Sequence, residues 1–229
     1  LVMICAPILL GIWLTRKFKP GWRLYGIGAA TFLLSQVVHL PFNSLLNDLF
    51  LRGILPLPPD AWKDAFNALI GGLSAGIFEE TARYIMYRWF AKDARSWGKG
   101  LLAGAGHGGF ESILVGLIFF LNFFQLAAYR GQDLSRLVPP AQLPQLQATM
   151  QTFWSLPWYD SLLGAVERIV ALSVHLSLSV MVLQVFIRKQ PVWLFLAIGW
   201  HALWDGVIVY AAITWGLHPA IGIEILSAL

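Results

Sequence analysis

Charged residues are scarce in this sequence: they make up 12% of its 229 residues, against about 25% in an average soluble domain. Hydrophobic residues make up 58%, and runs close to the ~20 apolar residues that cross a bilayer recur along the chain. This composition excludes an ordinary soluble domain and predicts an all-α protein that crosses the membrane several times. Segments of ten residues with alternating hydrophobicity, which are typical of a transmembrane β-barrel, are also missing.

Further absences narrow the possible chemistry. Cys5 is the single cysteine, which excludes an internal disulfide and a cysteine-based zinc site. The sequence has no His-Glu-x-x-His pair, so the common zinc-protease motif is missing. Asp205 has no evident aspartate partner, which disfavours an aspartyl dyad. The net charge of +4 is no signature of nucleic-acid binding, because basic residues in a membrane protein first report its orientation.

The apolar runs predict one integral membrane domain over residues 1–229, a transmembrane helical bundle with about seven spans. The expected spans are residues 1–15, 22–50, 61–90, 99–129, 159–187, 191–210 and 212–229. The long connection of about 130–158 is expected to lie on the periplasmic side and to contain a short interfacial helix, since glutamines alternate there with apolar residues. Gly100, Gly104 and Gly108 repeat every four residues, a pattern that lets membrane helices approach closely.

The basic residues predict the orientation. Of the 16 lysines and arginines, Arg83 and Arg168 lie within spans, and ten of the other fourteen belong to one set of alternate connections. The positive-inside rule places this set in the cytoplasm. We therefore expect a multi-pass protein of the cytoplasmic membrane with its N-terminus outside and its C-terminus inside.

Ionisable residues within the spans fall at a common depth. Counted at 1.5 Å per residue from the ends next to the basic connections, the acidic pair and three histidines lie about 12 to 20 Å deep. Charges in a span are costly and mark function by default, so these residues predict a polar chamber in the cytoplasmic half of the bundle. Its expected members are Glu79, Glu80, Arg83, His107, Glu111, His175, His201 and Asp205.

These residue types suit hydrolysis. Adjacent carboxylates resist double ionisation in a low dielectric, so Glu79 is a candidate general base for water, tuned by Glu80 and Arg83. Histidines without nearby thiols also suit Zn²⁺ held by nitrogen and oxygen ligands. The candidate metal ligands are His107, His175 and His201.

Other polar residues in the spans have weaker interpretations. Glu111 and Asp205 would orient histidines, as carboxylates around metal sites often do. Glu167 and Arg168 form either a structural pair or part of the site. His39, which has no evident partner, is interpreted as structural.

Three motifs carry a family resemblance: Phe78-Glu-Glu-Thr-Ala-Arg-Tyr84, Gly106-His-Gly-Gly-Phe-Glu111 and Trp200-His-Ala-Leu-Trp-Asp205. In this order on successive spans, they resemble the superfamily of CAAX prenyl proteases and bacteriocin-processing enzymes, and within it most closely the YhfC family of membrane peptidases. The resemblance covers about residues 70–210, the expected catalytic core. It implies intramembrane hydrolysis of a peptide bond, with Glu79 and His107 activating water. His201 and Asp205 would then bind the oxyanion or a metal.

The leading hypothesis is therefore an intramembrane endopeptidase that acts on a membrane protein or a lipidated peptide. The expected catalytic residues are Glu79, Glu80, Arg83, His107, Glu111, His201 and Asp205. Catalysis by glutamate alone and catalysis with Zn²⁺ both remain open. The alternatives are a proton- or ion-coupled transporter, which predicts inverted repeats and polar groups at all depths, and a non-catalytic scaffold or immunity protein.

Overall fold

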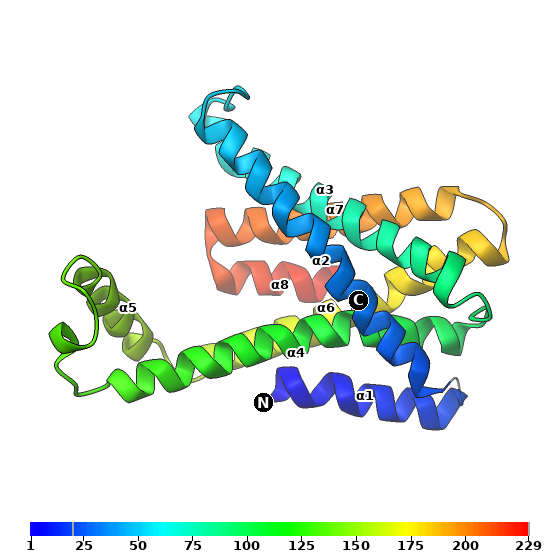
Figure 1. Ribbon diagram of the computed structural model, residues 1–229, viewed down its shortest axis with the longest axis horizontal. Helices are drawn as coiled ribbons and strands as arrows, with labels where there is room; N and C mark the ends of the chain where they lie inside the picture. Colours follow the sequence, from blue (N-terminus) through cyan, green and yellow to red (C-terminus); the bar gives the residue numbers. More distant parts are fainter. Residues whose placement is uncertain (20, 229) are drawn as a thin grey trace.

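The computed structural model describes residues 1–19 and 21–228, and the described chain is helical without strands. Figure 1 shows the seven helices of the bundle. Their bounds are α1 Val2–Phe18, α2 Trp22–Leu51, α3 Lys63–Ile85, α4 Trp97–Tyr129, α6 Asp160–Ile187, α7 Val192–Trp215 and α8 Leu217–Ala228. The short elements are 3₁₀ turns at Asp60–Trp62 and Leu134–Arg136, a π-helical turn at Met86–Phe90, and helix α5 at Leu143–Ser155.

The all-α prediction is confirmed, and seven helices lie close to the seven predicted positions. Four of them, α2, α4, α6 and α7, are long and apolar enough to cross a membrane by length and composition alone. The last boundary differs from the prediction, because α7 continues to Trp215 and α8 begins at Leu217 instead of residue 212. Gly216 lies between them with φ 89°, a conformation that glycine adopts without strain. With 12 residues, α8 is about 18 Å long.

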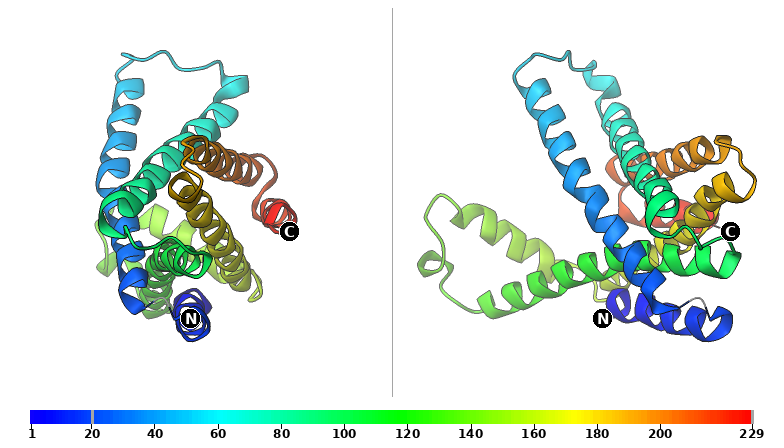
Figure 2. Two further views of the ribbon diagram at one scale, coloured as in Figure 1. Left: turned by 90° about the vertical axis from the view of Figure 1, so that its right-hand side faces the viewer. Right: turned by 45° about the vertical axis from the view of Figure 1, so that its right-hand side comes forward.

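The helices form a splayed bundle. In Figure 1, α2 and α3 make an antiparallel hairpin, and the long helix α4 carries α5 at its far end. The cytoplasmic connections predicted from the basic residues all lie at the opposite end of the molecule, on the right of that view. Figure 2 shows α8 at the edge of the bundle, next to α7. Large apolar side chains are exposed all around the bundle, as a lipid-facing surface requires.

Glycines set the helix spacing around the bundle centre. A Cβ at Gly104 would lie 2.9 Å from the backbone oxygen of His175, and one at Gly108 would lie 2.6 Å from the His175 Cβ. A Cβ at Gly72 would lie 2.4 Å from the backbone oxygen of Ala202. The close approach predicted from the glycine repeat is thus confirmed for α4 against α6, and α3 packs equally tightly on α7. These contacts bring the polar faces of four helices together.

Candidate metal centre and its chamber

Helix α3 supplies three buried charged residues to the site. Glu79 is 6% exposed, and Glu80 and Arg83 are 0% exposed. Because residues three and four apart share a helix face, Arg83 lies 3.3 Å from Glu80 Oε1 and 3.8 Å from Glu79 Oε2. Each carboxylate then pairs with a histidine of another helix.

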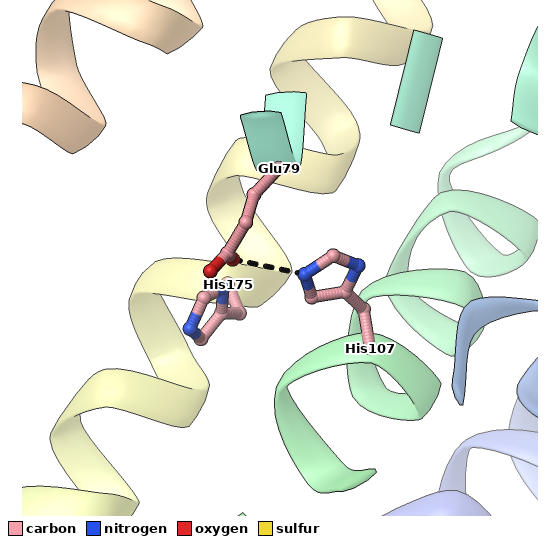
Figure 3. A group of neighbouring side chains, drawn as sticks. All are labelled: Glu79, His107 and His175. Atoms are coloured by element: carbon pink, nitrogen blue, oxygen red, sulfur yellow. Dashed lines mark hydrogen bonds and ion pairs between the residues drawn. The ribbon is translucent and has the colours of Figure 1, made fainter. Parts of the chain in front are cut away.

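Glu79 lies in a cluster with two histidines (Figure 3). Its Oε2 is 3.0 Å from Nε2 of His107 on α4, and His175 of α6 lies on the other side of the carboxylate. One potential ligand atom from each of the three residues lies within 4.8 Å of the other two, and all three side chains are buried. The described residues contain no second cluster of this kind.

Two further groups hold His175. Arg83 Nη2 donates to its Nδ1 at 2.5 Å, and its Nε2 lies 2.6 Å from Oε2 of Glu111. Glu111 is also 2.7 Å from Arg168 Nη1, and Arg168 in turn pairs with its neighbour Glu167. Glu111 therefore links the pair of Glu167 and Arg168 to the histidine cluster. The sequence left open whether this pair is structural or part of the site.

His201 of α7 lies next to His175 and between two carboxylates. Its Nδ1 is 2.7 Å from Glu80 Oε1, and its Nε2 is 3.4 Å from Asp205 Oδ2. The ring centroids of His175 and His201 are 5.6 Å apart, and those of His107 and His175 are 5.5 Å apart. The three histidines thus form a row, but His201 has a separate environment from the other two.

Helix α2 contributes a polar network that sequence analysis missed. Gln36 Nε2 donates to Glu79 Oε1 at 3.1 Å, and its Oε1 is 3.3 Å from Nδ1 of His39. On its other side, His39 Nε2 lies 3.0 Å from Ser74 Oγ and 2.9 Å from the Asn43 side-chain amide. His39 therefore has partners and connects through Gln36 to the acidic pair. No signal in the sequence distinguished Gln36 from other uncharged polar residues of a span.

A cavity of about 230 Å³ adjoins these groups. Helices α3, α4, α6, α7 and α8 supply its walls, and Val174, Trp204, Ile208 and Val209 form apolar parts of them. The polar lining consists of Glu79, Glu111, Glu167, Arg168, His175, His201, Asp205 and Glu224. The cavity is a polar chamber in an otherwise apolar bundle, and both His175 and His201 line it.

The Glu79, His107 and His175 cluster fits a catalytic zinc ion by its chemistry. One carboxylate and two imidazoles form a known catalytic zinc ligand set, which leaves a position open for water. A ligating histidine usually has a carboxylate at its other ring nitrogen, and Oε2 of Glu111 lies 2.6 Å from Nε2 of His175. A metal at Nδ1 of His175 would replace the hydrogen bond from Arg83.

The structure brings together all the residues predicted for the site but groups them differently. Of the three predicted metal ligands, His107 and His175 share the cluster. The third member is Glu79, and His201 pairs with Glu80 and Asp205 instead. Glu111 contacts His175 rather than His107, the histidine one turn before it on α4.

The fold and this cluster define a polytopic membrane protein with a buried carboxylate and histidine centre. The chain belongs to the YhfC family, which is described as YhfC intramembrane metalloprotease and matches residues 2–225. The family name thus describes a membrane protease that uses a metal.

A relative in Bacillus subtilis (strain 168), named "Uncharacterized membrane protein YhfC", is 33% identical over 239 aligned residues. The alignment covers 97% of this chain and 86% of the relative. No solved structure matches the chain. The resemblance inferred from the three motifs is therefore confirmed.

Proposed function

We propose that the protein is an intramembrane endopeptidase that hydrolyses a peptide bond of a membrane protein. In this proposal Glu79, His107 and His175 hold a zinc ion and His201 transfers protons. The observation that carries it is the convergence of three buried ligand atoms within 4.8 Å at the wall of a chamber that also exposes His201. Membership of the metalloprotease family supports the same reaction class.

A zinc ion bound there would supply Lewis acidity and would lower the pKa of a water ligand. The protein's part is to fix the ligands. Glu111 orients His175, Gln36 holds one oxygen of Glu79, and the other oxygen faces His107. Partners of this kind typically change metal affinity or activity 10- to 100-fold when they are removed.

His201 is the best placed group for proton transfer. Its hydrogen bond with Glu80 fixes the ring, so that Nε2 faces Asp205 and the chamber. An imidazole oriented by a carboxylate can take a proton from an attacking water and return it to a leaving amine. This assignment departs from the expectation that Glu79 is the general base, because Glu79 lies among the candidate ligands.

The test is hydrolysis by the purified protein in lipid nanodiscs, with the membrane proteome of its host as substrate and mass spectrometry of new termini as readout. We expect Glu79→Gln, His175→Ala and His201→Gln each to abolish new termini. The exposed Asp64 of α3 provides a control, and Asp64→Asn should act like the wild type.

Full activity in any of the three site variants would refute the residue assignment. Absence of wild-type proteolysis, together with a proton flux in liposomes that depends on Glu80, would support the transporter alternative instead.

A further inference from the structure

The charges around the chamber do not balance. The residues described above supply six carboxylates, which are Glu79, Glu80, Glu111, Glu167, Asp205 and Glu224, but two guanidinium groups. A divalent metal at the cluster and a protonated His201 would still leave one carboxylate without a counter-charge. Uncompensated charge in a low dielectric is costly, so an additional positive group in the chamber would be favoured.

Glu224 of α8 is the carboxylate without a partner. The residue is 1% exposed, and its Oε2 is buried without a hydrogen-bond partner among the described residues. The other acids are engaged: Arg168 pairs with both Glu111 and Glu167, and His201 lies next to Asp205. Glu224 lines the chamber, so its carboxylate borders the space that an entering group would occupy.

The geometry favours a side chain over a second metal ion. The acids of this wall do not bring three ligand atoms within 4.8 Å of one another, since the cluster at Glu79 is the one such group in the described chain. Trp204, Ile208 and Val209 line the chamber together with the acids. A lining of apolar side chains and a carboxylate complements an aliphatic stem with a cationic tip, as in lysine and arginine.

Resting on the proposed function, we propose that Glu224, assisted by Asp205, binds the cationic side chain of a lysine or arginine close to the scissile bond. The chamber would then select substrates with a basic residue at one fixed position. A single carboxylate in a substrate pocket selects basic side chains in other proteases. A hydrogen bond to a charged group corresponds to roughly 10- to 100-fold in kcat/KM.

The cleavage experiment uses hydrophobic host peptides in nanodiscs, in which one lysine is moved through every position, with norleucine at the same position as the neutral match. We expect wild-type protein to prefer lysine about 10- to 100-fold at one position relative to the cut. Glu224→Gln should remove this preference, Glu224→Lys should replace it by a preference for glutamate, and Asp64→Asn should retain it. Cleavage without a preference for lysine would overturn the proposed binding of a basic side chain by Glu224. A preference that persists in Glu224→Gln would overturn it as well. In both cases the proposed protease function stands.

A binding experiment needs no turnover. Hexylguanidinium chloride, with hexanol as the neutral match, is titrated into detergent-solubilised protein while the unfolding temperature is recorded. We expect hexylguanidinium to stabilise the wild type and Asp64→Asn but not Glu224→Gln. Equal stabilisation of all three proteins overturns the subsite, even where no peptide is cleaved and the proposed function itself has failed.

Discussion

Gln36 offers a direct test of how the acidic pair is held. Its amide donates to Oε1 of Glu79 at 3.1 Å, while Oε2 of the same carboxylate faces His107. Gln36→Leu removes the donor and leaves the Glu79 oxygen without this partner. A hydrogen bond to a charged group contributes about 1.5 to 3 kcal/mol, which predicts a loss of roughly 10- to 100-fold in zinc affinity and in kcat/KM.

The assay is a competition titration of zinc against a chromophoric chelator, followed by cobalt substitution. The visible spectrum of the cobalt protein reports the ligand geometry and would change in Gln36→Leu. The matched control is Gln184→Leu, because Gln184 is also a glutamine of a long helix but bonds the backbone oxygen of Val180 and the side chain of Arg188. Wild-type zinc affinity and spectrum in Gln36→Leu would refute the claim that α2 positions Glu79.

Two more predictions concern packing and orientation. Gly108→Ala would place a methyl group 2.6 Å from the Cβ of His175. We therefore expect about 1 to 3 kcal/mol of destabilisation and weakened zinc binding. Gly199→Ala, with open space at its Cβ, is the control and should unfold at the wild-type temperature. Equal unfolding temperatures of the two variants would contradict the described contact of α4 with α6. In a Cys5→Ser background, Asp93→Cys should react with a membrane-impermeant maleimide from the cytoplasm and Asp133→Cys from outside, and the reverse pattern would invert the predicted topology.

The helices could be predicted because hydrophobic length alone defines a membrane span. Their ends were less certain where an apolar run continues through a turn. Residues 211–228 are mostly apolar, and Gly216, followed by Pro219, was the local sign that α7 ends at Trp215. The glycine repeat of α4 predicted close packing, but the partner helix α6 became known only from the structure.

The sequence predicted how deep the site residues lie in the membrane. Counting residues from the basic ends placed Glu79, His107, His175 and His201 in one layer, and the structure brings them together. Depth does not determine which face of one helix meets which face of another. For that reason the sequence could not distinguish His201, held by Glu80, from Glu79 as the third candidate ligand. For the same reason it could not detect the contact of Gln36 with Glu79.

We propose that Glu79, His107 and His175 bind a metal and that His201 does not. Zinc content is measured by mass spectrometry of the purified wild type and of single variants, after correct folding is confirmed by the unfolding temperature. We expect about one zinc per chain in the wild type and in His201→Gln, and little or none in His107→Ala and His175→Ala. Loss of zinc in His201→Gln, or full retention in His175→Ala, would contradict it.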